Sequence, residues 1–265
     1  MGAAVALTIA GSDSSGGAGI EADLKTFSAL GVYGACAITA LTAQNTTGVL
    51  AIHDVPPEFV TAQIDAVFSD LDVGAVKIGM LANAAVVEAV AAALARRGAR
   101  NIVLDPVLAS SSGEKLLQPE ATGRLRALIA RVRVVTPNLP EAAILLDAPV
   151  ARDEREMQAQ AQKLLALGAQ AVLIKGGHLD ADESVDLLVD AHGSERFAAR
   201  RIATKNTHGP GCTLASAIAA GLAKGFSLHQ AVSEAKLYVS AAIEAADQIA
   251  IGSGCGPLHH FYKWW

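Results

Sequence analysis

Short apolar runs alternate with longer amphipathic segments along most of the chain. Val5–Ala10 is the first apolar run, and its length predicts a buried strand. A glycine-rich turn follows at 11–19, and residues 20–30 then show the period of a helix. The same patterns predict strands at 34–40, 75–80, 101–104, 132–135 and 171–174, and helices near 57–70, 83–97, 120–131, 138–146, 153–167, 211–224 and 228–248.

One stretch departs from this alternation. Residues 185–189 and 196–202 are both strand-like and are separated by a short turn at 191–194, which predicts an antiparallel hairpin. Elsewhere, alternating strands and helices predict a mostly parallel sheet with helices on both faces. We therefore expect an α/β three-layer sandwich with a small antiparallel segment. Its ligands should bind at the carboxyl ends of the strands. No linker or repeat interrupts residues 1–265, so we expect one domain.

Composition narrows the class of protein. The 265 residues are 52% hydrophobic and 18% charged, with a net charge of −5, so a basic surface for nucleic acid is not expected. The three cysteines lack the spacing of a zinc site or a redox pair, which favours a reducing cytoplasm. The apolar N-terminal run has no basic residues and ends at Asp13, so we expect neither a signal peptide nor a membrane helix there.

The first glycine loop, residues 11–19, lies between a predicted strand and a predicted helix. Gly17 stands where a P-loop needs lysine, and Ala22 stands where a dinucleotide fingerprint needs its third glycine. Two interpretations remain. The loop N–H groups face an anion, or serine and aspartate side chains satisfy the loop's own backbone.

A second glycine loop, residues 206–213, opens a helix rich in small residues. The N–H groups of Gly211, Cys212 and Thr213 are predicted to lie unpaired in the first helical turn, which is typical of an anion site. A thiol at this place should have a lowered pKa, so Cys212 is a candidate reactive group. The alternative is that Cys212 is a small buried apolar residue.

Seven motifs carry a resemblance to one family. In chain order they are AGSDSSGGAG at 10–19 with Asp23, TAQN at 42–45, KIGML at 77–81, DPV at 105–107, TPNLPE at 136–141, KGGH at 175–178 and NTHGPGCT at 206–213. Together they resemble the hydroxymethylpyrimidine/phosphomethylpyrimidine kinases of thiamine biosynthesis, which belong to the ribokinase-like superfamily. The resemblance covers nearly the whole chain.

The resemblance implies two successive phosphoryl transfers from ATP with Mg²⁺. The first phosphorylates the hydroxymethyl group of 4-amino-5-hydroxymethyl-2-methylpyrimidine, and the second phosphorylates the resulting monophosphate. It also implies a ribokinase-like fold and a small-molecule substrate, and because relatives are often dimers we expect a homodimer.

The resemblance also implies roles for residues in the substrate pocket. Gln44 resembles the side chain that reads the aminopyrimidine edge, because an amide offers both a donor and an acceptor. Asp23 and Met80 resemble further walls of that pocket, although the residues alone equally allow a solvated carboxylate and a core methionine. The remaining substrate contacts that the resemblance implies are Gly11, Ala18 and Val107.

On the phosphate side, the resemblance implies that Cys212 is the base for the acceptor hydroxyl, in a loop with Gly209 and Gly211. Glu141 and Asp105 are implied near Mg²⁺, although Asn138 with Glu141 also has the spacing of a helix capping box. Lys175 either neutralises phosphate or extends from its strand end towards solvent. The nucleotide contacts implied are Asn138, Lys175, Gly177 and Thr207.

The chain departs from the family pattern at Pro210, where threonine is expected. Proline has no N–H, so the loop lacks one possible phosphate donor.

Two other functions stay open. The first is pyridoxal kinase, whose acceptor is also a hydroxymethyl group on a nitrogen heterocycle. The second is a catalytically idle protein that binds nucleotide or pyrimidine. An NAD-dependent oxidoreductase is disfavoured because the dinucleotide fingerprint fails.

Overall fold

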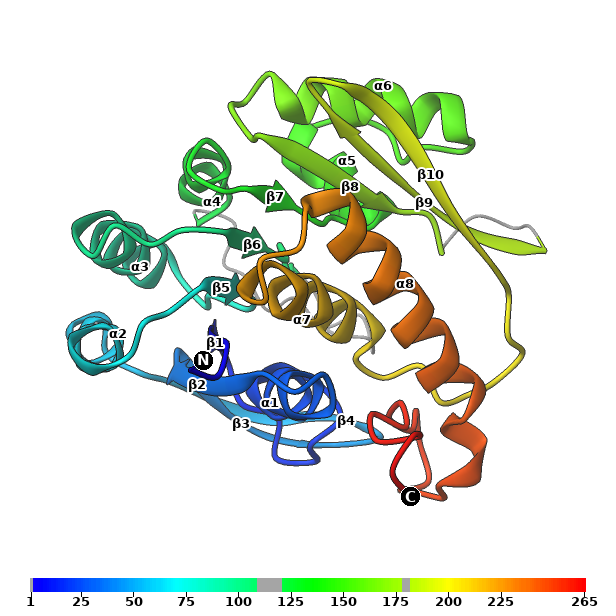
Figure 1. The fold of residues 1–265 in the computed structure, drawn as a ribbon, viewed down its shortest axis with the longest axis horizontal. Coiled ribbons are helices and arrows are strands. Elements are labelled where there is room, and N and C mark those ends of the chain that lie inside the picture. The colour runs from blue at the N-terminus through cyan, green and yellow to red at the C-terminus, as the bar shows by residue number, and fades with distance from the viewer. Residues whose placement is uncertain (1, 109–120, 178–181) are drawn as a thin grey trace.

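A twisted, mostly parallel sheet forms the centre of the molecule (Figure 1). The structure is a computed structural model and describes residues 2–108, 121–177 and 182–265. Within these residues, β9 is antiparallel to both of its neighbours, and the other strands up to β8 run parallel. In spatial order the strands are β10 (Gly193–Arg200), β9 (Glu183–Asp190), β8 (Ala171–Lys175), β7 (Val134–Val135), β6 (Ile102–Leu104), β5 (Ala75–Ile78), β1 (Val5–Ala10) and β2 (Tyr33–Ile38).

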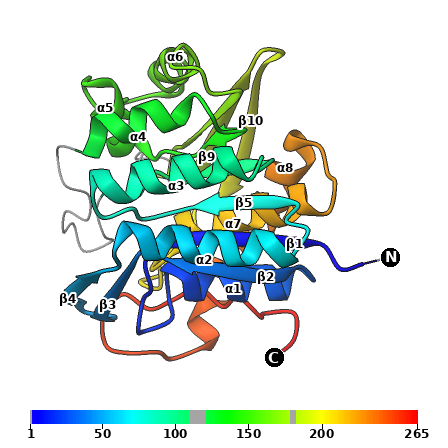
Figure 2. The ribbon, with the colours of Figure 1, turned by 90° about the vertical axis from the view of Figure 1, so that its left-hand side faces the viewer.

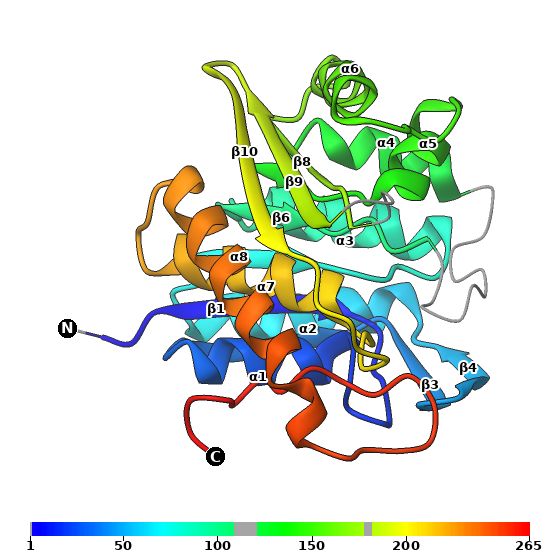
Figure 3. The same ribbon diagram turned by 90° about the vertical axis from the view of Figure 1, so that its right-hand side faces the viewer.

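Helices cover both faces of this sheet. Along β1, Leu7 and Ile9 belong to one buried cluster and Ala6 belongs to the other, because side chains of a strand alternate between faces. Facing Ala6 are α1 (Gly19–Ala29), α7 (Pro210–Ala223) and α8 (Leu228–Glu244), which Figure 3 shows in front. Facing Leu7 are α2 (Pro57–Asp70), α3 (Ala84–Arg96), α4 (Thr122–Ile129), α5 (Leu139–Leu146) and α6 (Glu154–Leu165), several of which are in front in Figure 2. The predicted three-layer α/β fold is confirmed.

Small residues let α7 lie deep in the molecule. Most of its residues are buried, and it contacts α8 along its length. A Cβ atom added at Gly221 would lie 2.9 Å from the Cβ of Ala231 on α8, so only glycine permits this approach. The alanine-rich composition therefore reflects close helix packing, which fixes the position of the α7 N-terminus over the sheet.

A second, two-stranded sheet was not predicted. It consists of β3 (Ala40–Asn45) and β4 (Gly48–Asp54), and it projects from the strand-end side of the molecule opposite the N-terminus (Figures 2 and 3). The predicted strand at 34–40 ends earlier, at Ile38. The hairpin escaped prediction because β4 is exposed along most of its length, so no apolar alternation marks a buried face.

Other predicted elements are present with bounds shifted by a few residues. The hairpin predicted near 185–202 is β9 and β10, and the helix predicted to 248 ends at Glu244 and continues as a short 3₁₀ turn, Ala246–Gln248. Glu120, the predicted start of α4, and His178 of the KGGH motif lie outside the described residues. No helix in the described ranges is both long enough and apolar enough to span a bilayer.

Candidate active site

A cavity of about 610 Å³ lies at the carboxyl ends of the parallel strands. Its walls come from the loops after β1, β5, β6, β7 and β8 and from the N-terminus of α7. The order of the sheet reverses between β1 and β5, which is where α/β sheets bind ligands. Fourteen predicted site residues line the cavity: Gly11, Ala18, Gln44, Met80, Asp105, Val107, Asn138, Glu141, Lys175, Gly177, Thr207, Gly209, Gly211 and Cys212.

The side chain of Asp13 accepts hydrogen bonds from the backbone of its own loop, the first glycine loop. The Asp13 carboxylate accepts hydrogen bonds from the N–H groups of Gly17 (3.1 Å) and Ala18 (2.8 Å) and from the N–H and hydroxyl of Ser15. The loop therefore satisfies its own backbone, the second of the two interpretations offered by the sequence. Burial opposes ionisation of this carboxyl, but the hydrogen bonds from His208 and Ser15 lower its pKa to about 2.

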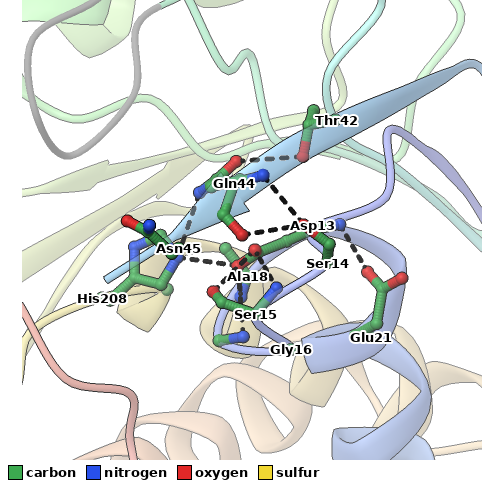
Figure 4. Close-up of polar contacts among 12 residues, drawn as sticks. Asp13, Ser14, Ser15, Gly16, Ala18, Glu21, Thr42, Gln44, Asn45 and His208 are labelled. Carbon is green, nitrogen blue, oxygen red and sulfur yellow. Dashed lines mark hydrogen bonds and ion pairs between the residues drawn. The ribbon is translucent and has the colours of Figure 1, made fainter. Parts of the chain in front are cut away.

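His208 and Gln44 complete this end of the cavity (Figure 4). The His208 Nε2 atom is 2.8 Å from Asp13 Oδ2, and the same ring nitrogen is 3.3 Å from the Gln44 amide nitrogen. His208 was not among the predicted site residues, although it belongs to the NTHGPGCT motif. Its place inside the second glycine loop, directly before Gly209, was the available signal.

The two glycine loops touch. Gly209 has φ +86°, and a Cβ atom there would lie 2.0 Å from the carbonyl oxygen of Gly17. Pro210 is the first residue of α7, where the missing N–H is one that the helix does not use. The prediction that Thr213 has an unpaired N–H is wrong, because this group donates to the Gly209 carbonyl (3.0 Å).

The predicted lowering of the Cys212 pKa is also wrong. Burial raises the pKa of this thiol to about 11, and the nearby carboxylates of Asp105 and Asp23 add to the rise. The Lys77 ammonium and the Gly19 N–H lower the pKa, but by less than burial and the carboxylates raise it. The free protein at neutral pH therefore holds Cys212 as a thiol, and the helix N-terminus does not decide its charge.

Asp23 lies beneath the cavity and does not line it, which corrects its predicted place in the substrate pocket. The carboxylate is fully buried and accepts from Lys77 (2.8 Å), Thr8 (2.6 Å) and Ser216 (2.6 Å). Burial disfavours the Lys77 charge, but Asp23 raises the pKa of that ammonium above its usual range. Lys77, also missed, reaches the cavity, and Asp23 holds it there.

A second charged cluster lies at the ends of β6 and β8. Lys175 Nζ is 2.7 Å from Asp105 and 3.9 Å from Glu141. Asn138 and Glu141 form the capping box that their spacing allowed, with both bonds at 2.8 Å. Burial raises the pKa of Glu141 to about 7 against the opposing charge of Lys175. Lys175 itself is held charged by the two carboxylates despite its burial.

The far end of the cavity, along β9, β10 and α8, is basic. Lys236 on α8 is 2.8 Å from Asp186 on β9, and Arg201 donates to the Gly177 carbonyl (3.0 Å). Of these residues only Gly177 was predicted, and the basic pair Arg200 and Arg201 at the end of β10 was the available signal for the rest. No three His, Cys, Asp or Glu side chains in the described parts of the chain are grouped as a metal site of their own.

Comparison with known proteins decides the family. The family model for phosphomethylpyrimidine kinase matches residues 13–259. The chain belongs to this family. It is 58% identical over 263 residues to a hydroxymethylpyrimidine/phosphomethylpyrimidine kinase of Rhizobium meliloti, covering 99% of this chain and 98% of that one. The resemblance seen in the motifs is confirmed.

Two further relatives extend the comparison. The thiamine biosynthesis bifunctional protein ThiED of Geobacter sulfurreducens is 51% identical over 255 residues, which are 96% of this chain and 51% of that one. Among solved structures, the ADP complex of Bacillus subtilis pyridoxal kinase matches with a TM-score of 0.91 and 37% identity, covering 98% of both chains. The ribokinase-like fold that the motifs implied is therefore confirmed.

The buried ion pair beneath the cavity gives a stability prediction. Asp23→Ala leaves the Lys77 charge without its partner, and we expect a loss of about 3–5 kcal/mol in the free energy of unfolding, measured by urea denaturation. The double variant Asp23→Leu/Lys77→Met should lose less than Asp23→Ala, because no buried charge remains.

The matched control is Asp72→Ala, since the Asp72 side chain is 98% exposed and should change the free energy of unfolding by about 0.5 kcal/mol or less. A loss below about 1 kcal/mol for Asp23→Ala would contradict the importance of the pair.

Proposed function

We propose that the protein transfers phosphate from ATP to 4-amino-5-hydroxymethyl-2-methylpyrimidine and then to the resulting monophosphate, in thiamine biosynthesis. The observation that carries the proposal is one cavity that joins an amide-bearing end, at Gln44, to a cationic end, at Lys175, across the N-terminus of α7. The names of the relatives from Rhizobium and Geobacter support this chemistry, and the Bacillus ADP complex supports a nucleotide at the cationic end.

In the first transfer, the acceptor hydroxyl oxygen bonds to the γ-phosphorus while the bond to the ADP oxygen breaks and the hydroxyl proton leaves. Charge on the transferred group faces Lys175, with the N–H groups of Gly211 and Cys212 in the first turn of α7. A loose transition state needs little help from a base until late, so position and neutralisation supply most of the rate. The thiolate form of Cys212, a small fraction at neutral pH because the thiol pKa is about 11, assists by accepting the hydroxyl proton.

Mg²⁺ fits the carboxylates at the centre of the cavity. Asp105 and Glu141 offer oxygen atoms, which this ion prefers, and two protein ligands with phosphate and water are a common arrangement for it. We therefore assign these two residues to the ion that accompanies ATP. When bound, it neutralises phosphate charge. Without the ion, the Lys175 charge offsets the repulsion between the two carboxylates.

A second candidate function is phosphorylation of pyridoxal. It is favoured by the TM-score of 0.91 to the Bacillus pyridoxal kinase. The acceptor atom would be the same kind of hydroxymethyl oxygen, so the phosphate end of the cavity serves either substrate, and the difference lies at the Gln44 end.

Two features support a cytoplasmic enzyme that does not bind nucleic acid. The net charge is −5, and the three cysteines are free thiols, as in a reducing compartment.

Product analysis tests the proposed function directly. Purified protein with ATP and Mg²⁺ is given hydroxymethylpyrimidine or pyridoxal, and products are followed by mass spectrometry. We expect pyrimidine monophosphate first and diphosphate later. Pyridoxal phosphate alone would replace the proposal with vitamin B6 salvage, and no product from either acceptor would indicate a binding protein.

Cys212→Ala should separate the two transfers. As a base, the thiol matters for a hydroxyl acceptor but not for a phosphate that is already charged, so we expect a loss of roughly 10²-fold in kcat/KM for the first transfer and under about threefold for the second. Because the thiol pKa is about 11, first-transfer kcat/KM of the wild type should rise with pH between 7.5 and 9.5. The variant should lack this rise.

Cys36→Ala is the matched control, since Cys36 lies outside the cavity. Equal losses in both transfers would exclude an asymmetric role for Cys212.

We also propose a homodimer that uses the β3–β4 hairpin. Leu41, Leu50 and Ile52 on this hairpin are 47%, 77% and 43% exposed, which is typical of an interaction surface. Sedimentation equilibrium should give twice the chain mass of 27.1 kDa, and Leu50→Lys should shift the protein towards the monomer. A wild-type mass of one chain at micromolar concentration would contradict the dimer.

A further inference from the structure

The His208 ring lies between two side chains that arrive from other parts of the chain. Asp13 comes from the loop after β1, and Gln44 comes from β3 (Figure 4). The ring is buried, and its Nε2 atom contacts both neighbours, at 2.8 Å and 3.3 Å. This shared nitrogen limits what the Gln44 amide can do.

The contact with Asp13 fixes a hydrogen on Nε2. Asp13 is an ionised carboxylate that accepts from three other residues, and a carboxylate accepts only. Nε2 therefore donates to it, whether the ring is neutral or charged. A nitrogen that donates cannot also accept from the Gln44 NH₂ group. The amide oxygen therefore belongs at the position that the structure gives to the amide nitrogen, facing His208. The two ends of an amide have nearly the same shape, and the hydrogen-bond network decides between them.

The other end of the amide leads to the same orientation. Thr42 Oγ1 lies 2.9 Å from the Ser12 carbonyl oxygen and 3.3 Å from the Gln44 amide. A hydroxyl has one hydrogen, and the nearer carbonyl can only accept it. Thr42 Oγ1 is therefore an acceptor towards Gln44, which places the NH₂ group on the Thr42 side.

We propose that His208, held by Asp13, is a positioning residue that locks the Gln44 amide in one orientation and thereby makes the site selective for an aminopyrimidine. The inference rests on the proposed function and identifies a residue that determines its substrate specificity. The free edge of a locked amide presents one N–H and one oxygen lone pair in a fixed order. The 4-aminopyrimidine edge presents an amine donor beside a ring-nitrogen acceptor, which matches that edge in one order only.

Pyridoxal meets this edge differently. Beside its hydroxymethyl group it carries an aldehyde oxygen, which only accepts, and a phenolic oxygen. A fixed orientation of the Gln44 amide therefore strengthens binding of the pyrimidine more than it strengthens binding of pyridoxal. If the Gln44 amide is no longer held in one orientation, the KM for the pyrimidine should rise. The kcat should change little, since in this proposal the amide contacts the pyrimidine ring and not the reacting atoms.

The test is a double-mutant cycle between His208 and Gln44. We expect His208→Leu to raise the KM for hydroxymethylpyrimidine about tenfold, with kcat within about threefold and the KM for pyridoxal raised far less. In a Gln44→Met background, where no amide remains to be oriented, the same His208→Leu change should alter the pyrimidine KM by less than about twofold.

A conservative variant and a variant at a second position distinguish a local effect of His208→Leu from misfolding. His208→Gln retains an N–H donor and should recover most of the pyrimidine affinity. ADP binding by calorimetry reports whether the neighbouring phosphate loop is intact. If His208→Leu loses ADP binding, Thr42→Val removes the other anchor of the amide and should raise the pyrimidine KM about threefold.

The outcomes separate the inference from the proposed function. A wild type that does not phosphorylate hydroxymethylpyrimidine overturns the function itself. The inference is overturned if the wild type is active but the effects of His208→Leu and Gln44→Met simply add, or if His208→Leu weakens pyrimidine and pyridoxal equally. No rescue by His208→Gln would likewise exclude a role for the donor.

Discussion

The contact between the two glycine loops is the constraint on which the site depends. Gly209 approaches the Gly17 carbonyl so closely that no side chain fits between them. This contact brings the start of α7 against the loop after β1, so Cys212 comes to lie beside the Gly19 N–H and His208 beside Asp13. Neither pair is close in sequence. One steric requirement, satisfied by two glycines, therefore brings together the α7 end and the Gln44 end of the cavity.

Charge balance around Cys212 follows from this assembly. Two lysines, Lys77 and Lys175, face three carboxylates, those of Asp23, Asp105 and Glu141. The lysines remain charged because each is paired, whereas the thiol remains neutral because burial and the carboxylates outweigh the lysines. An incoming phosphate changes this balance, since it adds negative charge at the place where Lys175 is held. The free site thus holds two charged lysines without carrying a free thiolate.

The sequence was informative where a periodic pattern or a local motif carries the information. Strands and helices of the central sheet follow from apolar periodicity, and Asn138 with Glu141 follows from a spacing of three. It was uninformative where tertiary contacts decide. Asp23 has the position of a helix-surface carboxylate, and only the fold shows that Lys77 reaches it from β5. The pKa of Cys212 depends in the same way on burial, which a rule for helix termini does not include.

His208 illustrates a third kind of information, which is the capacity of each group to donate or accept a hydrogen bond. Its role does not follow from burial or from a distance alone, because 3.3 Å to Gln44 describes an attraction or a repulsion depending on which amide atom faces the ring. The ionised Asp13 removes the ambiguity, since a group that only accepts forces its neighbour to donate. Asp13 thus fixes the Nε2 hydrogen of His208, and His208 in turn fixes the orientation of the Gln44 amide. Thr42 favours the same orientation from the other end of the amide. In the proposed mechanism, Asp13 of the first glycine loop therefore influences recognition of the acceptor ring through His208 and Gln44, without contacting the substrate itself.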